Sequence, residues 1–151
     1  MAPGVTEPLN PRRAGEADFD ELTDLWERSA RSTHGFLADE DVSEMRPSVR
    51  DLLLPSMDVW VVDVDAEAAA FAGVRDHHVE LLYVEPRHHG RGLGSRLLRW
   101  TAATTVEVYA DNVTGMGFYR SHGFTETRRD PTDVLGRPFP IAHLARRSVT
   151  P

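Results

Sequence analysis

Hydrophobic side chains recur at three- and four-residue steps in the segment that follows Asp18. The residues concerned are Phe19, Leu22, Leu25 and Trp26. This spacing predicts an amphipathic helix, because an α-helix turns once every 3.6 residues and so brings all four side chains onto one face. We expect Asp18 to cap this helix, with Glu21 as its capping-box partner three residues later. Gly35 is expected to end it.

Three further helices are predicted downstream. They cover Asp41 to Leu53, Gly92 to Ala103 and Thr114 to His122. Pro47 partly interrupts the first of these and Pro55 marks its end, because proline cannot donate a backbone hydrogen bond. Gly123 follows the last of them at a position where a left-handed backbone costs glycine little.

Runs rich in β-branched and aromatic residues predict the strands. They are Leu9–Arg12, Val59–Val64, Ala69–Arg75, Val79–Val84, Thr104–Tyr109, Phe124–Arg128 and Ile141–Arg146. The last two form a closing hairpin around a turn at residues 133–138. We therefore expect an α+β fold with a mixed central sheet flanked by helices and a C-terminal β-hairpin. Residues 1–11 are expected to be a loose lead-in, and residues 12–151 a single domain.

Composition narrows the class of protein. Apolar residues make up 40% and charged residues 27% of the 151 residues, the balance of an ordinary globular domain. The net charge of −7 argues against a nucleic-acid partner, and no apolar run is long enough to span a membrane. Without a signal-type segment we expect a cytoplasmic protein. The chain has no cysteine, so cysteine nucleophiles are excluded, and all 17 basic residues are arginine, so the chain has no lysine to modify.

The segment EPRHHGRGLGSRLL, residues 85–98, joins a predicted buried strand to a predicted helix. The start of a helix presents unpaired backbone N–H groups and the positive end of the helix dipole, so an anion is a natural ligand there. Gly90, Gly92 and Gly94 remove the Cβ atoms that would hinder close approach. A purely structural turn remains an alternative. The segment lacks the GK[ST] of a Walker loop, and its G-x-G-x-G spacing differs from the dinucleotide-binding pattern.

The run VEPRHHGRGLGSRLL, residues 84–98, resembles the acetyl-CoA motif of the GNAT superfamily of N-acetyltransferases, V-x-P-x-Y-R-G-x-G-x-G/A followed by a helix. A second run, NVTGMGFYRSHGF, residues 112–124, resembles the family signature N-x-x-A-x-x-F-Y-x-x-x-G-F. The order of strands and helices also agrees, over most of the chain. The runs THGFL, residues 33–37, and DVLGRPFP, residues 133–140, resemble the YjaB-like branch of small bacterial enzymes.

The resemblance implies acetyl-CoA as co-substrate and names the residues that would bind it. Leu82, Tyr83 and Val84 would lie along the pantetheine arm, and Asn112 would hydrogen-bond it. The pyrophosphate would be held by backbone N–H groups of His89, Gly90, Arg91, Gly92, Leu93, Gly94 and Ser95. The family usually has Arg or Gln where this chain has His89, so cofactor affinity is expected to be weaker or more dependent on pH.

Tyr119 matches the family tyrosine that protonates the departing CoA thiolate, although a tyrosine in FYRSHGF could equally serve core packing. An amine nucleophile must lose a proton, so a base or a water relay is also expected. His78 and Glu80 are two residues apart on one strand and so share a face. They are candidates for the base, and a solvated strand edge is the alternative.

The acceptor side is expected between the first two helices and the closing hairpin. The candidates are Trp26, His34, Phe36 and Phe139. Trp26 and Phe36 are each expected more as core residues than as site residues, whereas His34 has fewer packing reasons to be there. No metal site is expected, because neighbouring residues on a strand point to opposite faces and His77 and His78 cannot easily bind one ion.

The leading hypothesis is an acetyl-CoA-dependent N-acetyltransferase that acetylates a primary amine of a small molecule or of a peptide or protein. Because the chain has no cysteine, transfer is expected to be direct rather than through a cysteinyl acyl-enzyme. The alternative is a catalytically weak CoA-binding module with a regulatory or partner-binding role. A homodimer formed by pairing of an exposed C-terminal strand also stays open.

Overall fold

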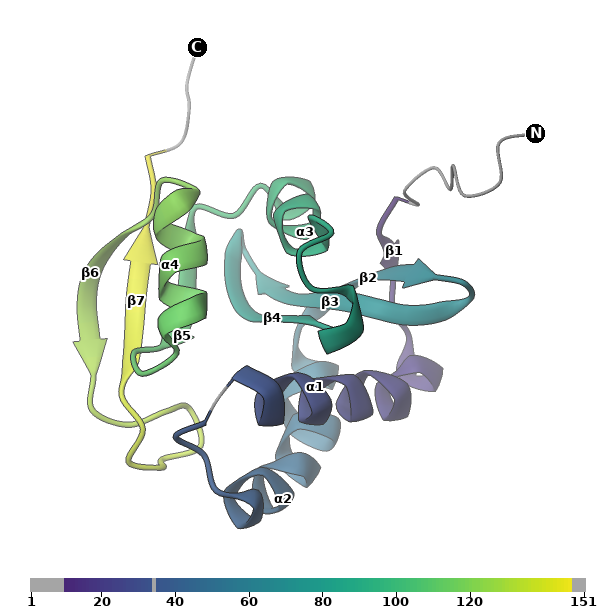
Figure 1. Ribbon diagram of the computed structural model, residues 1–151, viewed down its shortest axis with the longest axis horizontal. Helices are drawn as coiled ribbons and strands as arrows, with labels where there is room; N and C mark the ends of the chain where they lie inside the picture. The colour runs from purple at the N-terminus through teal and green to yellow at the C-terminus, as the bar shows by residue number, and fades with distance from the viewer. Residues whose placement is uncertain (1–9, 34, 148–151) are drawn as a thin grey trace.

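The computed structural model describes residues 10–33 and 35–147 and has a central sheet of seven strands (Figure 1). The strands are β1 (Arg12–Arg13), β2 (Asp58–Val64), β3 (Glu67–Arg75), β4 (His78–Val84), β5 (Thr105–Tyr109), β6 (Thr125–Asp130) and β7 (Ile141–Ala145). The helices are α1 (Phe19–Thr33), α2 (Asp39–Ser48), α3 (Leu93–Thr101) and α4 (Val113–Ser121). A π-helical turn (Val49–Leu53) and a 3-10 turn (Leu54–Ser56) extend α2 as far as β2.

The sheet is mixed, as predicted, with the strand order β1-β2-β3-β4-β5-β7-β6. Neighbouring strands are antiparallel except β4 and β5, which run parallel. The predicted closing hairpin is confirmed as β6 and β7. Its second strand lies between β5 and β6, so that β7 pairs with both. The expected lead-in falls almost entirely on residues 1–9, which lie outside the described residues.

Each face of the sheet has its own hydrophobic cluster. Side chains of α3 and α4 pack with one face, around Leu97, Val106 and Leu144. Side chains of α1 and α2 pack with the other, around Trp26 and Phe71. Alternate residues of a strand point to opposite faces, so the same strands contribute to both clusters. The α1/α2 cluster draws its sheet residues from β2, β3 and β4.

The start of α1 differs from the capping prediction. The Asp18 carboxylate accepts a hydrogen bond from the backbone N–H of Gly15 at 2.8 Å, so the cap forms one turn earlier than expected. Glu21 instead accepts from the backbone N–H of Ala68, at 3.0 Å. The predicted capping pair is therefore wrong, because a tertiary contact to β3 uses the carboxylate that a local cap would need.

A β-bulge in β4 changes which side chains face which cluster. Gly73 pairs with Leu81 and Val74 with Val79, so Glu80 is the extra residue on β4. Val79 belongs to the α3/α4 cluster, and Leu81, only two residues later, belongs to the α1/α2 cluster. A regular strand would have placed both on one face. The bulge therefore lies at one of the predicted base residues.

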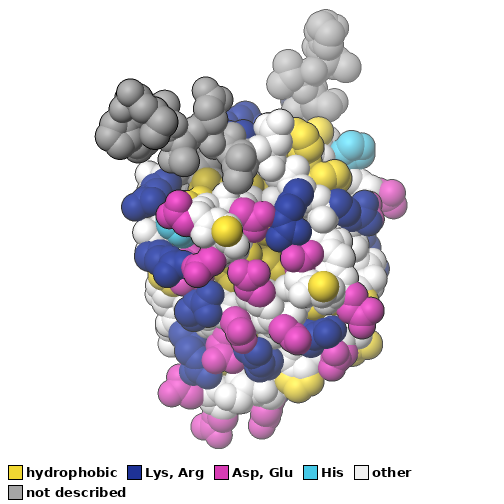
Figure 2. Space-filling view, turned by 90° about the vertical axis from the view of Figure 1, so that its right-hand side faces the viewer, with side chains coloured by type: hydrophobic (Ala, Val, Ile, Leu, Met, Phe, Trp, Pro, Cys, Tyr) yellow, Lys and Arg dark blue, Asp and Glu magenta, His cyan; other side chains and the backbone are white. Residues whose placement is uncertain are grey.

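Charged side chains of both signs are interspersed on the molecular face shown in Figure 2. Ion pairs at the surface of the described residues include Arg12 with Asp18 and Asp63, and Arg50 with Asp20. Exposed pairs of this kind add little to stability, typically about 0–1 kcal/mol each. The mixture of signs keeps the face shown in Figure 2 from presenting a patch of one charge.

Candidate active site

A cavity of about 460 Å³ opens where β4 and β5 diverge. The two strands pair at only two positions, His78 with Thr105 and Val79 with Val106. Beyond these pairs Leu82, Tyr83 and Val84 of β4 line the cavity, as do Val108 and Tyr109 of β5. The strand β4, which is predicted to bind the cofactor, thus forms one wall of the cavity. Beyond the two paired positions its edge toward β5 has no pairing with that strand.

The turn that contains Gly90 and Gly92, called the glycine turn below, forms the end of the cavity beside α3. Gly90 and Gly92 have φ values of +79° and +78°, a left-handed conformation that side chains other than glycine rarely adopt. A Cβ atom added at either would meet no atom within 4 Å. Space for a ligand therefore lies directly against the backbone, at the N-terminus of a nine-residue helix. This arrangement fits a phosphate group.

The predicted cofactor residues lie at this cavity, with one exception. His89, Gly90, Gly92, Leu93, Gly94, Ser95 and Asn112 all line it, together with the three β4 residues. Arg91 is not among the lining residues; its guanidinium lies 3.2 Å from Nδ1 of buried His88. Asn112 accepts a hydrogen bond from the N–H of Gly115 at 2.9 Å and so caps α4.

Two histidines near the turn make specific contacts. His89 Nε2 lies 3.0 Å from the carbonyl oxygen of Val84 and so donates to it. His122 Nδ1 donates to the carbonyl of Phe118 at 2.8 Å, and its Nε2 lies 2.9 Å from the Ser95 hydroxyl. This second contact joins the first turn of α3 to the end of α4.

An ion pair between a half-exposed arginine and a buried carboxylate holds α1 against the end of β4. Glu85 is only 6% exposed. It accepts hydrogen bonds from Arg28 Nη2 at 2.7 Å and from Arg28 Nε at 2.9 Å, in a bidentate arrangement. Such pairs hold a defined geometry as well as contributing energy. The pair joins a helix of the acceptor side to the residue that precedes the glycine turn.

Tyr119 lines the cavity from α4 and is 4% exposed. Its ring makes edge-on contacts with the rings of Phe118 and Phe124, at centroid distances of 5.2 and 5.8 Å. Burial raises the pKa of its hydroxyl above the usual value, with a smaller contribution from Tyr83. The phenol therefore keeps its proton at neutral pH, as a general acid must. Packing and proton donation are compatible here.

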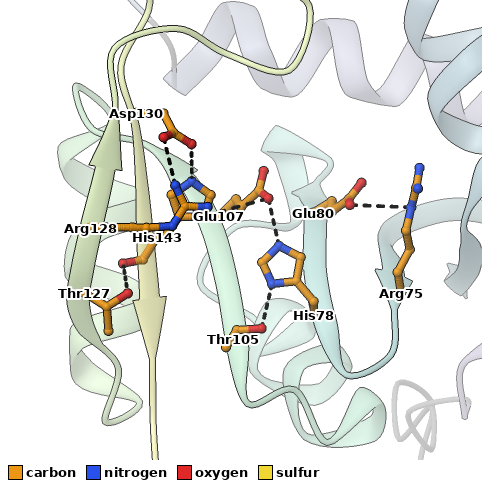
Figure 3. A network of polar contacts seen from close by, with 9 residues as sticks. All are labelled: Arg75, His78, Glu80, Thr105, Glu107, Thr127, Arg128, Asp130 and His143. Carbon is orange, nitrogen blue, oxygen red and sulfur yellow. Dashed lines mark hydrogen bonds and ion pairs between the residues drawn. The ribbon is translucent and has the colours of Figure 1, made fainter.

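Polar side chains from β4 and β5 meet beside the two paired positions (Figure 3). His78 Nδ1 lies 2.6 Å from the hydroxyl of Thr105, and Nε2 lies 2.8 Å from a carboxylate oxygen of Glu107. Glu80 pairs with Arg75 at 3.4 Å. Glu80 and Glu107 line the cavity, whereas His78 lies behind them.

Sequence reasoning missed Glu107. Its only local signal is a charged residue in the otherwise apolar strand TTVEVY, and its partners come from another strand. His78, Glu80 and Glu107 each place a potential metal-ligand atom within 4.8 Å of the others. The predicted histidine pairs did not indicate this grouping, because Glu107 is distant in sequence.

Where the acceptor is predicted to lie, the cavity is lined by Trp26, Ser29 and Thr33 of α1 and by a group of apolar residues. The apolar residues are Met45, Val49, Leu53, Val134, Leu135 and Ile141. Phe36 and Phe139 do not line the cavity. Their rings pack against each other at 5.9 Å and against Tyr109 at 5.3 and 6.4 Å, behind the wall. His34 lies outside the described residues.

Asp133 is a second site residue that sequence reasoning missed. It lines the cavity at 6% exposure and accepts the Tyr109 hydroxyl at 2.9 Å. Its other oxygen accepts the N–H groups of Leu135 and Arg137, at 3.0 and 2.9 Å. Arg137 then pairs with Asp41 of α2 at 2.9 Å. The loop between β6 and β7 is thereby held against both β5 and α2.

Tyr83 and Tyr109, two aromatic residues of the cavity wall, have raised pKa values. Burial raises the pKa of Tyr83 to about 12, although a hydrogen bond with Trp26 acts in the opposite direction. Burial likewise raises the pKa of Tyr109. Both hydroxyls stay neutral at physiological pH. The cavity wall also contains the carboxyl side chains of Glu80, Glu107 and Asp133.

No helix in the described ranges is long and apolar enough to cross a membrane.

Comparison with known proteins identifies a matching family and two similar proteins. A family model described as an acetyltransferase (GNAT) domain matches residues 55–126. Peptidyl-lysine N-acetyltransferase YjaB of Salmonella typhimurium is 32% identical over 141 residues, which are 90% of this chain and 97% of that protein. The protein of the same name from Escherichia coli is 33% identical over 142 residues, covering 91% and 96%.

Solved structures agree with the fold. The solution structure of apo-form YjaB from Escherichia coli has a TM-score of 0.82 at 31% identity and covers 94% of this chain and 98% of that one. The PaiA N-acetyltransferase of Thermoplasma acidophilum, crystallised in complex with coenzyme A, has a TM-score of 0.64 at 18% identity, covering 89% and 96%. At that identity the second likeness concerns the fold alone.

Proposed function

Because this chain belongs to the GNAT superfamily of acetyltransferases, we propose that it transfers the acetyl group of acetyl-CoA directly to the side-chain amine of a peptidyl lysine. The chain is an N-acetyltransferase, and acetyl-CoA is its co-substrate. The choice of a peptidyl lysine is supported by the two relatives that are named peptidyl-lysine N-acetyltransferase. The apolar acceptor side, with room for an aliphatic stem, supports it too.

The observation on which the proposal mainly depends is the opening between β4 and β5, with the glycine turn at its end. Leu82, Tyr83 and Val84 would bind the pantetheine arm along this opening. Backbone N–H groups from His89 to Ser95 would hold the pyrophosphate where Gly90 and Gly92 leave the backbone accessible. Bound there, acetyl-CoA supplies a thioester whose acetyl carbon is open to attack by an amine.

Tyr119 is the proposed general acid. Its buried hydroxyl lines the cavity and stays protonated at neutral pH because burial raises its pKa. A donor of this kind stabilises the negative charge that develops on sulfur as the C–S bond breaks. Direct transfer requires no nucleophile from the protein, in keeping with a chain that has no cysteine.

Glu80 and His78 are the residues proposed to act as the base. The contacts of the site make Glu107 a third candidate for this role. A lysine side chain arrives as an ammonium ion and must lose a proton before it can attack. Glu80 and Glu107 line the cavity, and His78 is hydrogen-bonded to Glu107 at 2.8 Å. Either carboxylate can accept the proton, directly or through a water molecule.

The test is turnover with acetyl-CoA on three kinds of amine acceptor. The panel comprises peptides whose only free amine is a lysine side chain, matched peptides whose only free amine is the N-terminus, and small alkylamines and polyamines. We expect CoA release and peptide acetylation with the first kind. Turnover on small amines alone would make this a small-molecule enzyme. Tight binding of acetyl-CoA without turnover on any amine would favour the catalytically weak CoA-binding module.

A further inference from the structure

A chain of polar side chains extends from the cavity wall across three strands of the sheet (Figure 3). It begins at Glu107 on β5 and passes through His143 on β7 to Asp130 on β6. Glu107 lines the cavity, whereas Asp130 has a side chain that is 44% exposed. The chain thus joins the cavity to solvent at the outermost strand.

The strand order makes this connection. Glu107 and His143 are register partners, and His143 is also the register partner of Arg128 on β6. Both pairings depend on β7 lying between β5 and β6. Directly paired residues of adjacent strands have their side chains on the same face. The row of side chains is therefore built by the sheet, and no loop contributes to it.

The row contains one hydrogen bond and one longer contact. His143 Nε2 donates to a carboxylate oxygen of Asp130 at 2.7 Å. Nδ1 lies 3.9 Å from an oxygen of Glu107 and is an acceptor whenever the ring carries a single proton on Nε2. That distance exceeds a hydrogen bond and suits a rotation of the carboxylate or one bridging water. The same Glu107 oxygen is 2.8 Å from His78 Nε2.

The charged surroundings keep the solvent end of the row deprotonated. His143 is the largest cause of the lowered pKa of Asp130, and Arg128, 2.8 Å from Asp130, acts in the same direction. Asp130 is thus held as a carboxylate at the solvent end. On the cavity side Arg75 pairs with Glu80, and Thr105 holds His78. These are the titratable and charged groups that the structure places against the row.

We propose that Glu107, His143 and Asp130 form a proton path that carries the proton released by acetyl transfer out of the cavity to solvent. This proposal rests on the proposed function. In that reaction the C–N bond forms as the C–S bond breaks. The nitrogen of the ammonium loses two protons: one ends on the CoA thiol through Tyr119, and one must leave the protein. His143 and Asp130 touch no substrate and act as relay residues.

The step through His143 is a tautomer exchange. Protonated Glu107 gives its proton to Nδ1 of His143, while Nε2 releases its own toward Asp130 and solvent. The ring is neutral before and after this step. Rotation of the His143 side chain and exchange of the ring proton with solvent restore the starting tautomer before the next turnover. No oxidant or further reactant is needed, because the proton is the only species that moves.

The test is chemical rescue of His143→Gln, which keeps a polar side chain but cannot relay a proton. In weakly buffered solution we expect a kcat about tenfold below that of the unchanged chain, with an unchanged KM for acetyl-CoA. Added imidazole should restore at least half of the loss. Asp130→Asn should show a smaller loss, about threefold, with the same rescue. Because the Asp130 side chain is 44% exposed, we expect the Asp130→Asn variant to fold.

Thr127→Val is the matched control, because the Thr127 hydroxyl touches only the backbone carbonyl of His143, at 3.2 Å. Its kcat should equal that of the unchanged chain and should not respond to imidazole. A His143→Gln variant with full kcat, or with a loss that imidazole does not restore, would overturn the proton path. Absence of turnover in the unchanged chain would instead refute the proposed function, and the path with it.

Discussion

All three tyrosines of the chain have a raised hydroxyl pKa, and burial is the largest cause for each. They are Tyr83, Tyr109 and Tyr119, and each lines the cavity. A phenol that resists ionisation can donate a hydrogen bond over the whole physiological pH range. The common property of the three residues thus follows from the apolar character of the cavity that they surround.

This shared property predicts an alkaline transition. Because the folded-state pKa values lie above the value of about 10 for free tyrosine, their contribution to stability is complete below pH 10. It is lost as the pH rises through the folded-state values, since only the unfolded chain ionises readily. We expect tyrosinate absorbance near 295 nm to appear together with loss of circular dichroism. Ionisation at pH 10 with the fold intact would contradict this.

The role of Tyr119 predicts a specific loss in Tyr119→Phe. The ring contacts with Phe118 and Phe124 remain, so we expect the melting temperature and the KM for acetyl-CoA to change little. Removal of the donor should lower kcat about a hundredfold, the lower end of what a general acid contributes. Steady-state kinetics measure kcat and the KM for acetyl-CoA, and thermal unfolding measures the melting temperature. A variant with full kcat would assign Tyr119 to packing alone.

The candidate residues divide according to how local their signals are. Asn112 and Tyr119 were predicted because they stand in one contiguous run of sequence, and both line the cavity. Glu107 and Asp133 line it too but were not predicted. Their partners, His78 and Tyr109, come from other elements, and no spacing along the chain encodes that proximity.

At the scale of elements, periodicity predicted where helices and strands lie to within a few residues. It could not predict the bulge at Glu80 or the place of β7 between β5 and β6. Pairing of strands distant in sequence is decided by packing against both faces, which a local pattern does not contain. These two unpredicted features are the ones that arrange the proposed base and the proposed proton path.

The hairpin between β2 and β3 offers a prediction about stability. Asp65 and Ala66 form its two-residue turn with φ values of +53° and +66°, as a type I′ turn requires. Alanine is strained there, so Ala66→Gly should stabilise the protein by about 1 kcal/mol and raise the melting temperature by about 2–4 °C.

The neighbouring Ala68 provides the matched control for this substitution. It is a buried residue of β3, a strand in which glycine gains nothing from its conformational freedom. Ala68→Gly should therefore lower the melting temperature, because glycine loses more backbone entropy on folding and leaves a small cavity. A decrease in both variants would show that the turn is unstrained.

At the scale of the whole molecule, the absence of lysine acquires a functional meaning. The chain contains no lysine, so if its acceptor is a lysine side chain, as proposed, it offers no such amine to itself or to other copies. After prolonged incubation with acetyl-CoA, intact-mass measurement should find at most one acetyl group on the chain, at the N-terminal amine. A lysine-containing acceptor protein in the same tube should be acetylated. Several acetyl groups on this chain would contradict the prediction.

The short pairing of β4 with β5 leaves an edge in the interior of the sheet. Backbone amide hydrogens on that edge, beyond Val79, find no partner on β5 among the residues described. They should exchange with deuterium quickly in the free protein and slowly once a ligand lies along the strand. The peptide that spans β4 would then report cofactor occupancy by its mass alone, without a label and without any acceptor being known.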